Sequence, residues 1–233
     1  MYIKKDTLRF LQDLKRNNNR EWFNDNKDKY ISANENFIQF VQSLINEVAK
    51  FDDSVAGLDA KYCVFRIYRD IRFSKNKLPY KTNFGATLMG KHNNCGIAGY
   101  YVHIEPGDSF LAGGVHMTEP RNLEAIRERI SAKGKEFLSI INDRTFKSNF
   151  MIQGEKLLRI PQGFNKDDPM GDFLKYKQLT IIHSVKDKDI VSEGFVRYCS
   201  KIFKAMVPFN SFVNKSLMSP AQKEPGHYSC SPE

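Results

Sequence analysis

The sequence lacks any long apolar run, which argues against a protein with membrane-spanning helices. No segment comes near the roughly 18 consecutive apolar residues that a helix needs to cross a bilayer. Residues 1–15 alternate charged and apolar side chains, so they do not form the apolar centre of a secretory signal. We therefore expect a cytoplasmic protein with no membrane partner.

Cysteine is scarce, and its spacing excludes the common cysteine motifs. None of the four cysteines forms a CxxC pair, which argues against a zinc knuckle or a dithiol redox site. Reduced thiols fit the expected cytoplasm, and two disulfides remain the alternative. The GxGxxG and Walker sequences are also absent, so neither standard device for nucleotide binding is present. We predict no metal and no cofactor.

What the sequence does contain is enough apolar material for one core. With 233 residues, 41% of them apolar, the chain can bury one large core. Charged residues make up 27%, an ordinary globular fraction, so neither disorder throughout nor a fibrous protein is indicated. We predict a single domain over residues 1–218. From residue 219 the composition turns to Pro, Gly, Ser, Gln and Lys, and residues 219–233 are predicted to be a disordered tail.

Apolar residues recur at helical spacing in both the first and the last part of the chain. We predict a short helix over residues 8–14 with Asp6 and Thr7 as caps, and a long helix over residues 20–51 with a possible break at 32–36. Two further segments follow Pro120 and part near Gly134. A short helix is expected after the loop near residue 168, and a last long helix over residues 191–206 ends at Pro208, with a short helix after it.

Between these helical parts the apolar spacing changes to two, which is typical of strands. The consecutive strands imply antiparallel pairing, and Pro106-Gly107-Asp108 predicts a β-hairpin. The order of helices, then strands, then a mixed part favours an α+β fold. The predicted strands cover residues 62–69, 84–89, 97–105, 110–117, 157–160 and 179–185.

Residues 62–81 are unusually basic. They hold six basic side chains and the single acid Asp70, so they carry five of the nine net positive charges of the chain. Like charges this close together repel one another unless an anion balances them. The basic side chains are Arg66, Arg69, Arg72, Lys75, Lys77 and Lys81.

Strand alternation would put the charged groups of this segment on one face. Arg66, Tyr68, Asp70, Arg72 and Ser74 share one parity, and Cys63, Phe65, Ile67, Ile71 and Phe73 share the other, which we expect to be the core face. Arginine binds phosphate or carboxylate in a planar, bidentate manner, and Asp70 can orient a neighbouring arginine. The predicted ligand-binding residues are Arg66, Arg69, Asp70, Arg72, Ser74, Lys75, Lys77, Tyr80 and Lys81.

Three hypotheses follow from this segment. The first is a small anionic or phosphorylated ligand, bound by a protein that could be an enzyme. The second is a nucleic-acid-binding module, because aromatic and basic residues interleave, although Phe65 and Phe73 fall on the predicted core face. The third is a structural or interaction protein whose charges pair internally, with carboxylates such as Glu105 or Asp108.

Other groups carry weaker signals. His103 shares a predicted strand face with Tyr101 and Glu105 and is the best single candidate for acid–base chemistry. A metal site assembled from it with His116 or His183 is less favoured than ordinary structural histidines. Ser74 and Lys77 match SxxK, but Pro79 disfavours the helix that this motif requires.

Four ordered stretches resemble a known family. They are FLQDLKRNNNREWFNDNKDKY, FRIYRDIRFSKNKLPYKTNFGA, YYVHIEPGDSFLAGGVH and LLRIPQGFNKDDP, and together with the rest of residues 1–216 they resemble the bacterial and fungal family called domain of unknown function 2461. The resemblance implies no activity, because none is established for the family. Asn76 stands where the family pattern has Asp, which counts against a mechanism that needs a second carboxylate in this loop. The family's recurrent positions correspond here to Arg20, Glu21, Trp22, Phe23, Arg66, Arg69, Asp70, Arg72, Phe73, Ser74, Lys75, Lys77, Pro79, Tyr80, Lys81, His103, Pro106, Gly114, Arg127, Pro161, Gly163 and Phe164.

Overall fold

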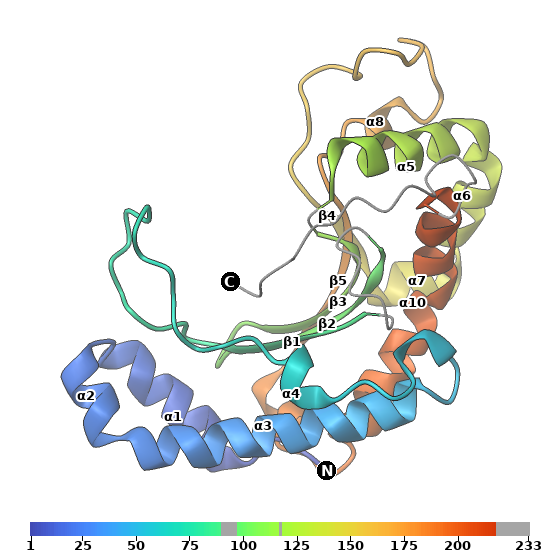
Figure 1. Ribbon diagram of the computed structural model, residues 1–233. Coiled ribbons are helices and arrows are strands. Elements are labelled where there is room, and N and C mark those ends of the chain that lie inside the picture. Colours follow the sequence, from blue (N-terminus) through green and yellow to red (C-terminus); the bar gives the residue numbers. More distant parts are fainter. Residues whose placement is uncertain (90–96, 117, 218–233) are drawn as a thin grey trace.

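The computed structural model describes residues 1–89, 97–116 and 118–217 (Figure 1). The predicted tail, residues 219–233, lies outside the described residues, as do Cys95, Cys230 and the last residue of the predicted strand 110–117. Within the described ranges the chain has an antiparallel sheet and many helices, so the predicted α+β class is confirmed. Each helix in these ranges is too short or too polar to serve as a membrane span.

The sheet has five strands in the order β1-β2-β3-β5-β4, and every neighbouring pair is antiparallel. The hairpin of β2 and β3 is the one predicted around Pro106-Gly107-Asp108. In β2 the alternation is clear, because Tyr100, Val102 and Ile104 are buried, whereas Tyr101 and His103 are half-buried on the other face. The strands are β1 (Phe84–Leu88), β2 (Gly99–Ile104), β3 (Ser109–Val115), β4 (Met151–Gln153) and β5 (Leu179–Val185).

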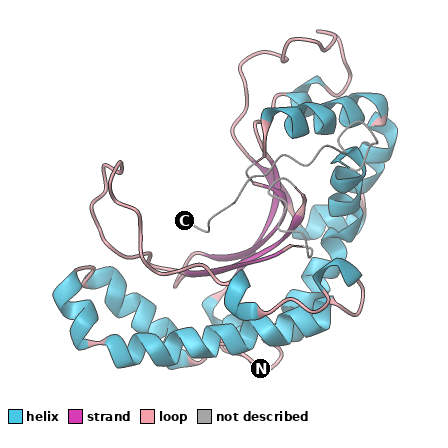
Figure 2. Cartoon of the chain, viewed as in Figure 1, coloured by secondary structure: helices cyan, strands magenta, loops and turns pink. Residues whose placement is uncertain are grey.

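Two long helices, α3 and α10, contact each other, and α3 also contacts β1 while α10 contacts β3, so the core lies between these helices and one face of the sheet (Figure 2). Phe203 of α10 meets Tyr100 of β2 with ring centroids 5.0 Å apart. The helices are α1 (Lys5–Arg16), α2 (Arg20–Asp25), α3 (Lys27–Val48), α4 (Ala60–Cys63), α5 (Pro120–Ala132), α6 (Gly134–Ile141), α7 (Arg144–Asn149), α8 (Gly171–Leu174), α9 (Asp187–Ile190) and α10 (Phe195–Leu217), with a 3-10 turn η1 (Asp53–Val55).

The prediction that Pro208 ends the last helix is wrong. Pro208 lies inside α10, which continues to Leu217. A proline inside a helix removes one backbone hydrogen bond and costs about 3 kcal/mol. Phe209, Phe212 and Val213 beyond it are fully buried against the core, and this burial outweighs the cost.

The long amino-terminal helix breaks earlier than predicted. The break is at Asn26, which caps α2 by donating from Nδ2 to the Trp22 carbonyl, and α3 runs unbroken through residues 32–36. Asn36 is buried there, but its side chain does not interrupt the helix. It accepts hydrogen bonds from the Lys4 backbone and the Thr7 hydroxyl and donates to the Tyr2 carbonyl, so it holds the amino-terminal segment against α3.

The predicted strand at residues 157–160 is also wrong. This part of the chain forms a single bridge, Lys156 with Tyr176, and Leu158 is 98% exposed. The edge strand is β4 instead, three residues long and largely exposed, which gives it too little apolar alternation to detect. The short helix α7, capped by the Asp143 carboxylate, was not predicted.

Candidate functional site

The basic segment forms an irregular hairpin, residues 64–81, which we call the basic arm. Its two sides are joined by backbone hydrogen bonds from Lys81 to Ile67 at 2.7 Å and from Arg69 to Pro79 at 2.9 Å, and Phe65 donates to Gly85 of β1 at 2.9 Å. In Figure 1 the arm runs from the β1 edge beyond the sheet and curves away from α3.

The predicted strand 62–69 is therefore only partly right. Residues 62 and 63 belong to α4, which the Asp59 carboxylate caps. The rest makes two isolated bridges, Val64 with Ala86 and Tyr68 with Tyr80. The two bridges are four positions apart along one side and six along the other, so a regular ladder cannot form between them.

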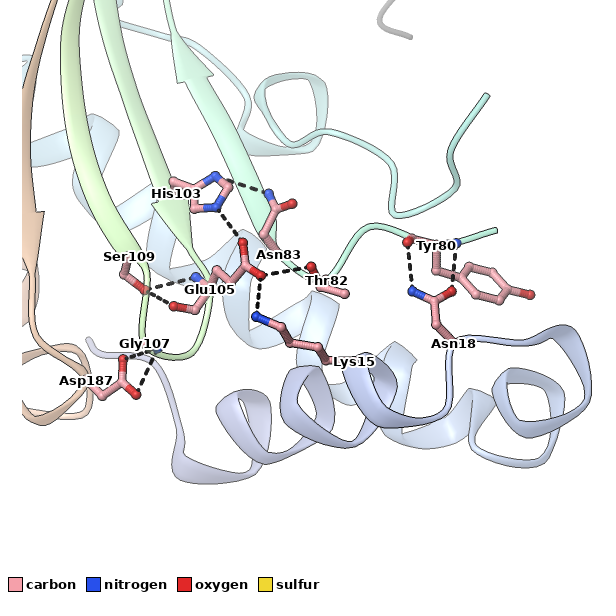
Figure 3. Close-up of polar contacts among 10 residues, drawn as sticks. All are labelled: Lys15, Asn18, Tyr80, Thr82, Asn83, His103, Glu105, Gly107, Ser109 and Asp187. Atoms are coloured by element: carbon pink, nitrogen blue, oxygen red, sulfur yellow. Dashed lines mark hydrogen bonds and ion pairs between the residues drawn. The ribbon is translucent and has the colours of Figure 1, made fainter. Parts of the chain in front are cut away.

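The arm is fixed to the helical layer at its base. Asn18, between α1 and α2, donates from Nδ2 to the Tyr80 carbonyl at 3.0 Å and accepts from the Tyr80 amide at 3.1 Å (Figure 3). The Tyr80 ring stacks on Phe23 of α2 with centroids 4.0 Å apart. These contacts position the return side of the arm against α2.

Charged side chains in the arm loop, residues 70–78, bond within the loop itself. Asp70 pairs with Arg72 at 2.6 Å, and hydrogen bonds from the Arg72 side chain and then its backbone hold the pKa of Asp70 at about 2. Lys77 donates to the Ile71 carbonyl at 2.9 Å. Thus Asp70 orients an arginine, as its spacing suggested, and the Arg72 charge is balanced locally.

Arg69 occupies a different position. Its guanidinium donates from Nη1 to the Leu78 carbonyl at 3.1 Å and from Nη2 to the Ser74 hydroxyl at 3.5 Å. Both acceptors are neutral, so the loop fixes the side chain without cancelling its charge. A fixed guanidinium with unused N–H groups suits an anionic ligand.

A hollow of about 340 Å³ lies between α2 and the basic arm. Two arginines, Arg20 and Arg69, line it, and its lining contains no carboxylate. None of the described residues forms an ion pair with Arg20. The lining consists of Arg20, Asn24, Tyr68, Arg69, Ile71, Pro79 and Tyr80.

Two of the predicted ligand-binding residues, Arg69 and Tyr80, therefore border this hollow, and the others do not. Arg20 was absent from the predicted site, although it lies in the first family motif. Nothing in its local sequence could bring it next to residue 69, because α2 meets the arm only through tertiary packing.

More positive charge surrounds Lys81. Burial lowers the pKa of Lys81, and the neighbouring Arg66 and Arg69 charges lower it further. The Lys81 ammonium lies 5.5 Å from the centre of the Phe65 ring. No described carboxylate lies within ion-pair distance of Arg66, and only the more distant Asp70 carboxylate responds to its charge. The combined effect of Arg66 and Arg69 on Lys81 indicates positive potential on this side of the arm.

Exposure along the arm departs from the predicted alternation. Ile67 is 1% exposed, as a core-face residue should be, but Phe73 is 95% exposed beside Arg72. The local bonds of residues 70–78 turn the chain away from the sheet, so the period of two ends before Phe73.

A polar network lies at the base of the basic arm, where β1 begins and β2 ends (Figure 3). The His103 Nδ1 atom lies 2.9 Å from the Tyr101 hydroxyl and 3.3 Å from the Asn83 amide, both donors, so Nε2 carries the proton toward Glu105 at 3.3 Å. Glu105 also accepts from Lys15 and Thr82. The predicted sharing of one face by His103, Tyr101 and Glu105 is confirmed.

Burial sets the protonation of this network. It lowers the pKa of His103, and the Glu105 carboxylate opposes this only in part. Burial, with a smaller effect of Glu105, raises the pKa of Tyr101 to about 12. Burial alone would raise the pKa of Glu105, but hydrogen bonds from Thr82, His103 and Lys15 together hold it below its ordinary value.

The other histidine prediction concerns metal binding. His183 bonds to the Asn149 carbonyl and the Tyr198 hydroxyl, and no group of three His, Cys, Asp or Glu side chains in the described ranges is placed to hold a metal ion. Glu105, which the third hypothesis pairs with the arm arginines, bonds to Lys15, Thr82 and His103 instead. Cys63 and Cys199 are free thiols.

Comparison with known proteins gives one match. No curated protein and no solved structure is similar to the chain at a significant level. A family model described as "Conserved hypothetical protein (DUF2461)" matches residues 6–212, which include α1 except its first residue, α2, the whole sheet, the basic arm and most of α10. The chain therefore belongs to the DUF2461 family of conserved hypothetical proteins.

Proposed function

We propose that the protein binds a small anionic or phosphorylated ligand, in the cytoplasm, in the hollow between α2 and the basic arm. Arg20 and Arg69 contact the anion, and Arg66 and Lys81 add positive potential nearby. The observation that carries this proposal is a pair of arginines facing a hollow whose lining has no acid, with Arg69 held by neutral acceptors. In a site of this kind each guanidinium can make charge-assisted hydrogen bonds to phosphate oxygens.

A thermal-shift experiment with inorganic pyrophosphate tests the proposal. Ligand that binds only the folded state raises the melting temperature. We expect a concentration-dependent rise for the wild type and its loss in Arg20→Gln and Arg69→Gln. The matched control is Arg9→Gln, an exposed arginine on α1 that pairs only with Asp6. Arg72→Gln should keep most of the rise, because Asp70 already balances that arginine. Equal rises in the wild type and in both hollow variants would refute the assignment.

A nucleic-acid strand on the same arm is the second candidate. Phe73 is 95% exposed and lies against Arg72, so a flat apolar surface beside a positive charge is available for a base to stack on. This candidate predicts single-strand binding that weakens steeply with salt, by a slope of about 0.7 per phosphate neutralised. Absence of binding at low salt would eliminate it.

The third hypothesis, internally paired charges, is the outcome in which neither ligand binds. The Asp70–Arg72 pair and the bonds of Lys77 support it for the arm loop. Arg20 and Arg69 do not fit it, because the described carboxylates do not pair with them. Arg66 is in no described ion pair, although its charge contributes to the low pKa of Asp70. Acid–base catalysis on the bound ligand would require a proton donor near the hollow. His103, the predicted candidate for that role, does not line the hollow.

A further inference from the structure

The hollow is larger than a small anion requires, and its lining contains more kinds of side chain than anion binding alone would use. A volume of about 340 Å³ falls at the lower end of small-molecule sites, which range from roughly 300 to 1,000 Å³. A lone phosphate would contact the two arginines and make no contact with the rest of the lining. Apart from Asn24, that rest is apolar and aromatic, with Ile71, Pro79 and two tyrosines.

The two tyrosines differ in what they offer to a ligand. Tyr80 is 5% exposed, and one face of its ring is stacked on Phe23. Tyr68 is 47% exposed, and its two aromatic neighbours, Phe23 and Tyr80, meet it at 62° and 55°. Neither ring lies flat on Tyr68, so among residues 1–89, 97–116 and 118–217 no ring is stacked parallel on it, and both neighbours hold its position. Tyr68 is therefore a fixed, open aromatic surface within the hollow.

The distribution of polar groups matches a ligand with two unlike parts. Arg20 and Arg69 supply positive charge and directed N–H groups. Asn24, also in the lining, carries a carboxamide that can both donate to and accept from the edge of a heterocycle. Stacking of a base on an aromatic side chain tolerates any base, because every base has a π face.

Resting on the proposed function, we propose that the ligand is a nucleotide unit, in which a phosphate bound by Arg20 and Arg69 is linked to a planar base that stacks on Tyr68. A free nucleotide and the phosphorylated end of a single strand present the same chemistry. The experiment below separates these two sources.

Calorimetric titration of the full chain tests this with a matched series: inorganic phosphate, ribose 5-phosphate, a purine nucleoside 5′-monophosphate and a short 5′-phosphorylated single strand. We expect the monophosphate to bind about tenfold or more tighter than ribose 5-phosphate, the range expected for one stacked base. Tyr68→Ala should remove that advantage and leave the affinity for ribose 5-phosphate unchanged. Tyr62→Ala is the control, an exposed tyrosine outside the lining.

The outcomes separate this inference from the function on which it rests. Equal affinity for the monophosphate and ribose 5-phosphate, both lost in Arg69→Gln, would overturn the nucleotide inference and leave anion binding intact. Binding of none of the four probes would overturn both. A strand that binds tighter than the monophosphate, with a salt-dependent difference, supports the inference with a nucleic-acid end as the source. If the strand and the monophosphate bind with equal affinity, and both bind tighter than ribose 5-phosphate, the inference is supported with a free nucleotide as the source.

Discussion

The body of the protein and its basic arm are stabilised in different ways. In the body, α3, α10 and one sheet face bury large side chains completely, such as Phe203 against Tyr100. The arm buries little beyond Ile67 and Tyr80, and its shape depends on side chains that bond to nearby backbone, such as Arg69 and Lys77. Hydrophobic burial thus sets the scaffold, and a few specific hydrogen bonds set the candidate site.

The largest expected effect comes from breaking the body. Phe203→Ala should reduce the free energy of unfolding by about 3–5 kcal/mol, because it removes a fully buried ring and leaves a cavity. Urea denaturation measures this loss. At a temperature at which the Phe203→Ala variant is still folded, its affinity for pyrophosphate should stay within twofold of the wild type, since Phe203 does not line the hollow. A large loss of affinity in folded protein would show that body and arm are not separable.

A smaller effect, confined to the arm, is expected for Asn18→Ala. It removes two hydrogen bonds to the Tyr80 backbone, worth about 1–3 kcal/mol together. Hydrogen exchange should accelerate at the amides of residues 67–81 and not in β3 or β5, and pyrophosphate should bind more weakly.

The matched control for this prediction is Asn17→Ala, which loses only a bond to the Asp13 carbonyl within α1. Unchanged exchange in the arm of Asn18→Ala would contradict the anchoring role assigned to Asn18.

The smallest effect concerns pH and the network at the base of the arm. The folded pKa of His103 is below its ordinary value of 6.5, so below that pH the unfolded chain binds more protons than the folded chain. The contribution of neutral His103 is therefore complete above pH 6.5 and is lost as the pH falls toward the folded pKa. Melting temperatures at pH 7.5 and 5.5 should differ more in the wild type than in His103→Gln. An equal difference would exclude His103 as the cause.

The sequence predicted the parts of the molecule that periodic burial organises. Alternation located β2, β3 and β5, and the apolar stripe located α10, since the same residues that show the period also form the core. The clustering of positive charge in the sequence also indicated residues 62–81 as the candidate ligand-binding segment. Prediction failed where one tertiary contact decides the structure, as for Asn36 inside α3 or the helix continuing through Pro208.

The candidate site shows the same limit. Arg66, Arg69 and Arg72 look alike in sequence, and only the fold separates an arginine paired with Asp70 from one that faces a hollow. Arg20 lies near Arg69 because Asn18 and Phe23 hold α2 against Tyr80, which is 62 residues from Asn18 along the chain. No local pattern carries that information.

The most direct test of the central claim is a crystal soaked with tungstate, a tetrahedral anion whose tungsten atom is located by its anomalous signal. We predict a peak in the hollow, with tungstate oxygens within hydrogen-bond distance of Arg20 and Arg69. An empty hollow, with peaks only beside Arg66, Arg72 or Lys77, would contradict the claim.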